Sequence, residues 1–266
     1  MKKEIRKVDK EKGIVQITTV DERWYARESK NKKTGLPEYE FVPSVTWIAG
    51  CYPKGVGFYK WLAQRNWDEA EAIKQEAGDK GSRVHKAIVD LLNKKEVKMD
   101  DKYFSDLTEE EKPLNLEEYE GLMSFVDWFN GRRPVILDKE FVVWREGYAG
   151  TVDMLCRIGG KTYIVDFKTS QSIWPSHEIQ ISAYKHALDH SKVEKGEEVS
   201  LMILQLGYKR NQRLWKENEV QDKFDLFQSA VKIWENENSG VSPSQKDYPQ
   251  ALSLLEEEKV KEKPKK

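Results

Sequence analysis

The sequence predicts a mixed α/β fold, with a central mixed sheet flanked by helices and an N-terminal strand and helical head region before it. Helical patterns come first, three strand-like apolar runs follow one another, and the chain then continues as helix, strands and helix. Its 266 residues are enough for one large or two small domains. An apolar fraction of 38% is low for a globular protein but above the disordered range, so we expect a folded core with a charged exterior.

Residues 1–42 are expected to form an N-terminal β arm. Strand-forming residues gather in Ile14–Val20 and Trp24–Arg27, and residues 31–35 are typical of a polar turn. A helical head region, 43–131, follows, and Ser44 is suited to cap its first short helix. Its further helices are expected from Phe58 toward Gly78, over Gly81–Asn93 and over Glu117–Asn130, with a loop containing a helical piece across 94–116.

The core is expected to span 132–238 and to contain the sheet. Its predicted strands and helices are Val135–Trp144, Ala149–Arg157, Thr162–Phe167, the helix His177–His190, a hairpin of Val199–Tyr208 and Arg213–Lys216, and the helix Lys223–Glu237. Residues 239–266 are polar and are expected to form a flexible tail.

Two acids and a lysine fall within Gly150–Ser170, the most informative stretch. Asp153 lies near the end of one apolar run and Asp166-Phe167-Lys168 ends the next, with a turn expected at 158–161. On a strand Asp166 and Lys168 share a face, and two carboxylates with a carbonyl suit Mg²⁺ or Mn²⁺. An isolated Asp-x-Lys is also typical of an ordinary ion pair across a surface hairpin, and that alternative stays open.

Further polar residues flank this stretch. His177, Gln180 and Tyr184 share one helical stripe downstream, and Gly81-Ser82-Arg83-Val84-His85 places a histidine early in a helix upstream. Taken by itself, a histidine in the position of His85 is more often a hydrogen-bonded helix residue than a metal ligand. Gly-x-x-x-His, Gly-x-x-Asp, Asp-x-Lys-Thr-Ser and Gln-x-x-x-Tyr, in this order, resemble the PD-(D/E)xK nuclease superfamily. The similarity is greatest to its RecB-like branch of phage exonucleases, the mitochondrial genome maintenance exonuclease and Cas4-type nucleases, and covers about Phe41 to Trp234.

The resemblance implies a restriction-endonuclease-like core and a metal-dependent DNA exonuclease. It implies action on single-stranded or frayed ends in phage or bacterial recombination, replication or repair. The implied metal ligands are His85, Asp153, Asp166 and the carbonyl of Phe167. The other implied catalytic residues are Lys168, which would position water or stabilise phosphorane charge, and Gln180 and Tyr184, which would brace the site. Glu140 is either an extra acid near the metal or a solvated strand-edge residue.

DNA contacts are expected from a local groove, because 45 basic residues are balanced by 46 acidic ones. The candidates are Ser44, Arg83, Thr169, Ser170, Lys209, Arg210 and Arg213, with base stacking on Trp47 or Tyr184. The arginines also fit the description of ordinary solvated charges, and Trp47 that of a core residue. DNA is the expected partner, and a recombination or replication protein is a further candidate.

Several classes are disfavoured by what the sequence contains. Two distant cysteines, Cys51 and Cys156, cannot hold an iron–sulfur cluster, so a Mg²⁺ or Mn²⁺ enzyme is favoured over a Cas4-type member. A phosphate-binding Gly-x-x-x-x-Gly-Lys-Ser/Thr loop is also missing, which excludes an ATP-driven motor in this sequence. The absence of an apolar leader or span predicts a cytoplasmic protein without a membrane partner. An endonuclease of the same fold, selective for structure or sequence, and a non-catalytic nucleic-acid-binding descendant remain alternatives.

Overall fold

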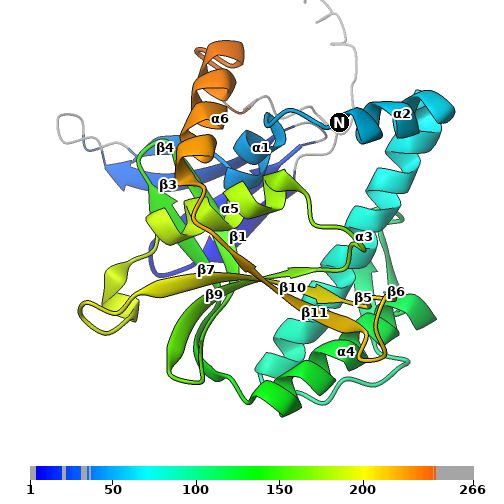
Figure 1. Cartoon of the computed structure of the whole chain (residues 1–266). Coiled ribbons are helices and arrows are strands. Elements are labelled where there is room, and N and C mark those ends of the chain that lie inside the picture. Colours follow the sequence, from blue (N-terminus) through cyan, green and yellow to red (C-terminus); the bar gives the residue numbers. More distant parts are fainter. Residues whose placement is uncertain (1–3, 20–21, 31–34, 36, 242, 244–266) are drawn as a thin grey trace, which may run out of the picture.

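A five-stranded sheet forms the centre of the computed structural model, which describes residues 4–19, 22–30, 35, 37–241 and 243 (Figure 1). The strand order is β11-β10-β9-β8-β7. These strands are β7 (Val135–Arg145), β8 (Tyr148–Ile158), β9 (Lys161–Lys168), β10 (Val199–Leu206) and β11 (Trp215–Val220). Strands β9 and β10 are parallel, and the other neighbours are antiparallel. The predicted mixed sheet and mixed α/β class are confirmed.

The connections explain this topology. Parallel neighbours need a long crossover, and helix α5 (Pro175–His186) supplies it between β9 and β10. Pro175 opens that helix at a position where a missing N–H is tolerated. The β8–β9 hairpin turns at Gly159 and Gly160, with φ of 56° and 81°, and Ile158 pairs with Lys161. Positive φ at both central residues matches the twist of a two-residue hairpin, as predicted at 158–161.

Helices cover both faces of the sheet (Figure 1). One face packs against α1 (Val45–Gly50), α5 and α6 (Phe224–Glu237), and the other against α3 (Trp67–Leu92) and α4 (Leu116–Arg132). Strand β9 shows this clearly, since Ile164 belongs to the first core and Val165 to the second. A strand buried on both faces carries a continuous apolar run, which is why β9 could be recognised in the sequence.

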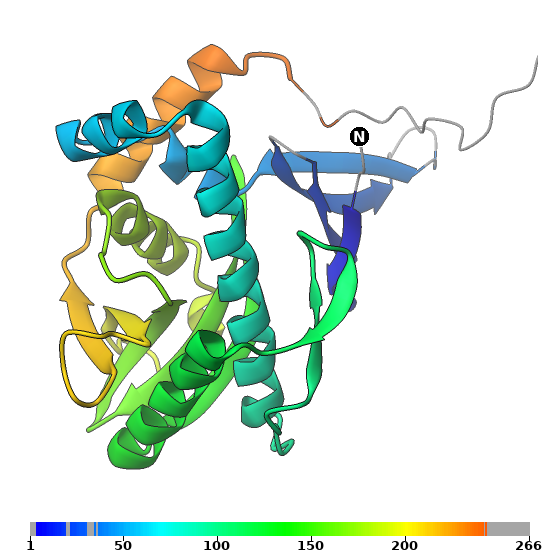
Figure 2. The ribbon, with the colours of Figure 1, turned by 90° about the vertical axis from the view of Figure 1, so that its right-hand side faces the viewer.

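A second sheet of four strands precedes the helices, with order β1-β2-β3-β4. Its strands are β1 (Glu4–Asp9), β2 (Ile14–Thr18), β3 (Arg23–Lys30) and β4 (Pro37–Pro43). It lies against β7 and β8 (Figure 2). The Tyr25 hydroxyl is 3.0 Å from Thr151 Oγ1 of β8. The strands expected near Ile14 and Trp24 are present, and most of the turn expected at 31–35 lies outside the described residues.

The head region differs from the prediction at one helix break. Helix α2 (Val56–Gln64) ends early, and α3 then runs unbroken through Gly78 and Gly81, where a break was expected. Arg65 is extended, and the Asn66 side chain accepts a hydrogen bond from Glu69 N at 2.7 Å. A cap of this kind starts a new helix, whereas an interior glycine costs only about 1 kcal/mol.

The segment 94–116 was predicted incorrectly as a loop with a helical piece. It contains a hairpin of β5 (Lys102–Ser105) and β6 (Glu110–Pro113). Ser105 is buried and donates to Asp79 Oδ2 of α3 at 2.8 Å, so tertiary contacts hold this polar hairpin in place. Helix α5 also stops at His186, before the predicted His190, and a short 3-10 turn, η1 (His190–Lys192), follows.

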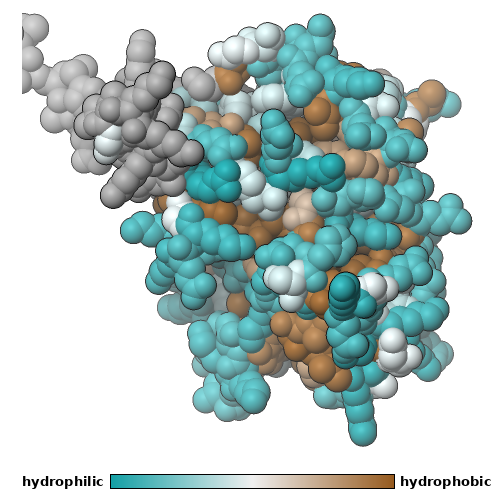
Figure 3. Space-filling model, turned by 90° about the vertical axis from the view of Figure 1, so that its left-hand side faces the viewer, coloured by the Kyte–Doolittle hydropathy of each residue, from teal (hydrophilic) through white to brown (hydrophobic). Residues whose placement is uncertain are grey.

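The surface agrees with the high charged fraction of 34%. Figure 3 shows a face on which hydrophilic residues dominate and apolar residues form patches between them. Among the described residues, no helix is both long and apolar enough to cross a bilayer. Most of the tail expected at 239–266 lies outside the described residues.

Candidate active site

Asp153 and Asp166 meet where strands β8 and β9 separate. The ladder between these strands ends at the pair Met154 and Val165, so the two acids occupy the next position in the same register. Asp153 is in the middle of β8, as it is in the predicted strand Ala149–Arg157. Phe167 N donates to Asp153 Oδ2 at 2.8 Å, so a carboxylate replaces the backbone acceptor that a continued ladder would supply.

Asp166 is held from two directions. Lys168, on the same face of β9, places its Nζ 2.7 Å from Asp166 Oδ2. From α5, Gln180 Nε2 lies 3.4 Å from Asp166 Oδ1 and donates to the Tyr184 hydroxyl at 2.7 Å. The sequence-predicted residues Asp166, Lys168, Gln180 and Tyr184 are thus brought together around one buried carboxylate.

Gly150 makes room for Tyr184. A Cβ at Gly150 would lie 2.4 Å from Tyr184 Cε1, which is closer than non-bonded carbons approach. The glycine of Gly-x-x-Asp and the tyrosine of Gln-x-x-x-Tyr therefore form one packing contact. Tyr184 is 4% exposed, so it supports Gln180 from the core and does not present its ring to solvent for base stacking.

His85 reaches the acids from the opposite face of the sheet, on α3. Its Nδ1 lies 3.4 Å from Asp153 Oδ1, and its Nε2 lies 3.0 Å from the carbonyl oxygen of Phe167. Its ring packs edge-on against the Phe167 ring. The imidazole therefore links two of the groups that the sequence assigns as metal ligands.

Electrostatics separate the two acids. Burial favours neutral Asp153, but His85, Lys168 and the Phe167 N–H outweigh it and lower the pKa of this carboxyl. For Asp166, burial dominates and raises the pKa, the nearby Lys168 opposes this, and the charge of Asp153 adds to the rise. Burial lowers the pKa of His85, but the carboxylate of Asp153 more than compensates and the net shift is upward. An added cation would relieve the repulsion between the acids.

The residues present fit a hard divalent cation. Asp166 Oδ2 is buried and receives no hydrogen bond of good geometry, although the Lys168 ammonium is within ion-pair distance. The buried carboxylate of Asp166, the carboxylate of Asp153 and the Phe167 carbonyl are the oxygen donors that Mg²⁺ and Mn²⁺ prefer. Within the described residues, no three His, Cys, Asp or Glu side chains already stand as a metal-binding group. His85 would therefore have to release a present contact to become a ligand.

Comparison with known proteins agrees with this geometry. A family model described as the PD-(D/E)XK nuclease superfamily matches residues 58–247. The chain belongs to the PD-(D/E)XK nuclease superfamily. Nucleases of this superfamily generally use divalent metals such as Mg²⁺ or Mn²⁺, and the five-stranded mixed sheet is consistent with its restriction-endonuclease-like fold. No individual curated protein matches the chain.

Glu140 does not contribute to the acid pair of this superfamily site. It has a positive φ of 45°, and its carboxylate pairs with Arg6 of β1 at 2.5 Å. Of the two interpretations left open by the sequence, the structure favours the solvated strand-edge glutamate, now joined to the N-terminal sheet.

Three of the residues proposed for DNA binding have structural roles instead. Arg83 is 6% exposed, pairs with Glu118 and donates to the Pro113 carbonyl at 3.1 Å. Ser44 is 1% exposed and caps α1 by accepting from Trp47 N at 3.1 Å. Trp47 packs edge-on against Trp24 and Trp234, 5.1 Å from each ring. Ser44 and Arg83 are thus too buried to contact a nucleic acid, and the partly buried Trp47 is packed in an aromatic cluster.

The remaining DNA-binding candidates lie on the segment after Lys168 and on the loop that contacts it. Thr169 and Ser170 directly follow Lys168 and are half-buried. The β10–β11 loop with Lys209 and Arg210 lies against this segment, because Lys209 N donates to Gln171 Oε1 at 3.0 Å. Lys209 Nζ also pairs with Glu117 at 2.9 Å. Arg213, on the same loop, lies over the ring of Trp215.

Sequence analysis missed a large groove, which we call the aromatic groove. It has a volume of about 700 Å³ and lies between α2, the first turns of α3 and the start of α5. Its aromatic lining is Tyr52, Phe58, Trp61, Trp67 and Trp174, and its basic lining includes Lys54, Lys74 and His177. The nine tryptophans of the sequence were a signal, but only the fold shows which of them face solvent.

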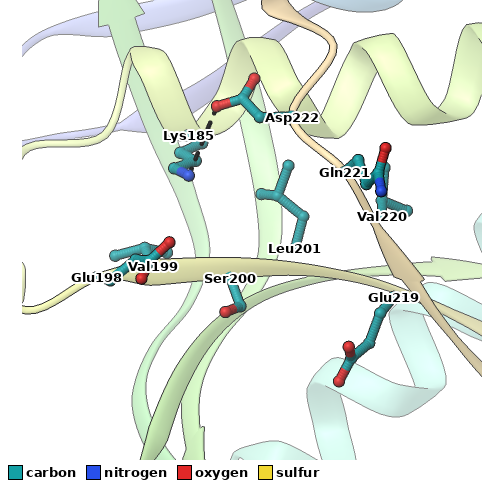
Figure 4. A pocket seen from close by; sticks show the side chains of 9 residues that line it. All are labelled: Lys185, Glu198, Val199, Ser200, Leu201, Glu219, Val220, Gln221 and Asp222. Atoms are coloured by element: carbon teal, nitrogen blue, oxygen red, sulfur yellow. Dashed lines mark ion pairs between the residues drawn. The ribbon is translucent and has the colours of Figure 1, made fainter.

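A smaller pocket, of about 260 Å³, lies at the far end of α5 and differs in charge (Figure 4). Its lining contains Glu198, Glu219 and Asp222, and Lys185 is paired with Asp222 at 3.5 Å. An acidic lining repels phosphate, so the aromatic groove is the better candidate for contact with a nucleic acid.

Proposed function

We propose that the protein is a metal-dependent deoxyribonuclease that removes nucleotides from single-stranded or frayed DNA ends, within the RecB-like branch of its superfamily. The observation that carries this proposal is the buried carboxylate of Asp166, with Lys168 Nζ 2.7 Å from its Oδ2 and the second acid, Asp153, at the facing position of the neighbouring strand. A buried carboxylate without enough partners is costly unless a cation completes its surroundings.

The metal ligands would be Asp153, Asp166 and the Phe167 carbonyl, with His85 after release of a present contact. A bound Mg²⁺ or Mn²⁺ would supply Lewis acidity toward the phosphate and lower the pKa of water. We infer that Mg²⁺ and Mn²⁺ both support the reaction, because the proposed donors are mainly oxygen atoms.

Lys168 has the role closest to the reacting atoms. Its ammonium lies beside the Asp166 carboxylate and is part-exposed, so it can hold an attacking water or stabilise negative charge that develops on the phosphorane. Gln180 positions Asp166 from behind and Tyr184 positions Gln180, so these two residues act through the carboxylate. The proposed assignment gives each residue of the Asp-x-Lys and Gln-x-x-x-Tyr motifs a separate task.

The test is digestion of single-stranded DNA labelled at either end, with Mg²⁺ or Mn²⁺ and with circular DNA as a parallel substrate. Asp166→Asn should lower the rate by about 100-fold or more, because it replaces an anionic ligand with a neutral side chain of similar volume. Glu140→Gln is the matched control, since its carboxylate pairs with Arg6 at the surface, and should keep the wild-type rate.

The outcomes separate the possible functions. Shortening of linear strands from an end, with circles left intact, supports the exonuclease. Circles cut as fast as linear strands would indicate an endonuclease. Hydrolysis that Asp166→Asn leaves unchanged would contradict the proposed site, and no hydrolysis with either metal would favour a protein that only binds nucleic acid.

A further inference from the structure

The aromatic groove exposes side chains that normally avoid water. Trp67 is 69% exposed and Trp174 is 50% exposed, and both lie on its lining. Flat π faces beside positive charge are the combination that binds single-stranded nucleic acid, in which bases stack on aromatic rings and lysines contact phosphates. In a duplex the base faces are already covered by their neighbours, so such rings favour a single strand.

Positive charge in the groove comes from Lys54 and Lys74. Both lysines line the groove, and burial, and then the charge of Lys74, lower the pKa of Lys54. Glu71, which is also on the lining, pairs with Lys74 at 3.2 Å. A phosphate beside Lys54 would favour its charged form, which gives charge complementarity between the groove and a DNA backbone.

One face of α3 leads from the groove to the acids. Trp67, Glu71, Lys74, Gly78, Gly81 and His85 follow one another at alternating spacings of four and three residues. Residues with these spacings form one stripe on a helix. The N-terminal half of this stripe, from Trp67 to Lys74, lines the groove. Its last residue, His85, contacts Asp153. One face of α3 therefore extends from the groove to the candidate active site.

Glycines keep the middle of that stripe bare. A Cβ at Gly78 would have no neighbour within 4 Å, and one at Gly81 would lie 3.5 Å from Thr169 Oγ1. Glycine weakens a helix interior. Two glycines on one face of α3 are therefore best explained if the backbone of a bound strand passes close to that face.

His177 provides a second link between the groove and the acids. It lines the groove one turn before Gln180, on the same helix. Burial, followed by the charges of Lys168 and Lys54, lowers its pKa to about 3. Lys54 lines the groove together with His177, and Lys168 belongs to the candidate active site.

We propose that the aromatic groove binds a single-stranded segment of the DNA substrate, with bases stacked on Trp61, Trp67 and Trp174. The backbone of this segment runs along the bare face at Gly78 and Gly81 toward Asp166. The destination of the strand rests on the proposed nuclease function, whereas occupation of the groove by a single strand can be measured without hydrolysis.

The first test measures binding of fluorescent dT20 and of a blunt 20-base-pair duplex in EDTA, where cleavage is prevented. Trp67→Ala and Trp174→Ala should each weaken dT20 binding by about 5- to 100-fold, as expected for loss of one stacked base, and leave duplex binding unchanged. Tyr39→Ala is the matched control, because Tyr39 is 51% exposed on β4 outside the groove, and should bind dT20 as the wild type does.

The second test fills the bare face. Gly78→Leu adds a side chain where there is open space and should keep or raise the Tm, since leucine is a better helix former than glycine. It should nevertheless weaken dT20 binding and slow cleavage by about tenfold or more, through steric exclusion of the backbone. Ala72→Leu is the control, since Ala72 is exposed on α3 outside the stripe.

The results distinguish this proposal from the nuclease proposal. Wild-type dT20 binding by Trp67→Ala, Trp174→Ala and Gly78→Leu would overturn the groove proposal even if hydrolysis is found. Weakened dT20 binding without hydrolysis by the wild type would support the groove and overturn the nuclease function. A change in oligomeric mass in Trp67→Ala, with unchanged dT20 affinity, would show that a second copy of the chain occupies the groove and would overturn it too.

Discussion

Gly150→Ala should damage the site from inside the core. The added methyl would lie 2.4 Å from Tyr184 Cε1, 3.2 Å from Cδ1 and 3.3 Å from Val45 Cγ2. Strand β8 is paired with β7 at Val143 and packs against α1 in this part of the sheet, so the Tyr184 ring must move. Overpacking of this kind costs about 1–3 kcal/mol, which corresponds to a fall in Tm of roughly 2–12 °C for a domain of this size.

The same displacement should reach Asp166. Tyr184 accepts the Gln180 hydrogen bond, and Gln180 faces Asp166, so Gly150→Ala should lower kcat by about 10- to 100-fold, as loss of a ligand-orienting contact does. Thermal unfolding and end-labelled DNA digestion measure the two effects. Gly131→Ala is the control, because its Cβ has no neighbour within 4 Å and Gly131 lies in α4, outside the aromatic groove.

A double-mutant cycle tests the cause. Tyr184→Ala removes the ring that the new methyl meets, so adding Gly150→Ala to it should cost much less than in the wild type. A Gly150→Ala variant with wild-type Tm and kcat would refute the reasoning. Equal effects of Gly150→Ala in the presence and absence of the Tyr184 ring would show that the damage comes from elsewhere.

Three further predictions concern charges. Lys168→Ala should lower kcat by about 10²- to 10³-fold with little change in KM in the digestion assay, and a rise in KM with kcat unchanged would argue for a binding role instead. Arg83→Ala leaves the buried carboxylate of Glu118 unpaired and should cost about 3–5 kcal/mol in urea unfolding, while a loss below 1 kcal/mol would contradict a buried pair. Hydrogen bonds from Thr162 and Arg157 lower the pKa of Glu197 to about 2 from its usual 4.5, so its stabilisation is present above that usual value and is lost as pH falls toward 2. Glu197→Gln should therefore lower the Tm at pH 6 but not at pH 2, and a constant difference between these pH values would exclude the assignment.

The strands and acids of the core could be predicted because their signals are local. Strand β9 is buried on both faces and reads as one apolar run, and two glycines mark the turn before it. The alternation of a strand places Asp166 beside Lys168 without knowledge of any other element. The order of helices and strands then indicated the mixed sheet.

Other features depend on contacts between distant residues and could not be predicted in this way. The β5–β6 hairpin is polar, and Ser105 is buried only because α3 supplies Asp79. Arg83 looks like a surface base until Glu118, 35 residues later, is found beside it. The helix break at Asn66 did carry a local signal, since Asn66 precedes Glu69 by three residues and resembles a capping box, but the interior glycines drew the predicted break to themselves.

Helix α3 sets a length scale for the substrate. Trp67 and His85 are 18 residues apart on one unbroken helix, which corresponds to about 27 Å at 1.5 Å per residue. At a stacked spacing of 3.4 Å, a strand of about eight nucleotides covers that distance. If the groove holds one part of the strand while the acids cut another, the length of α3 sets the distance between the bound nucleotides and the cleaved bond. Shorter strands lose contact with Trp67, so digestion should slow and leave limit products of about this length.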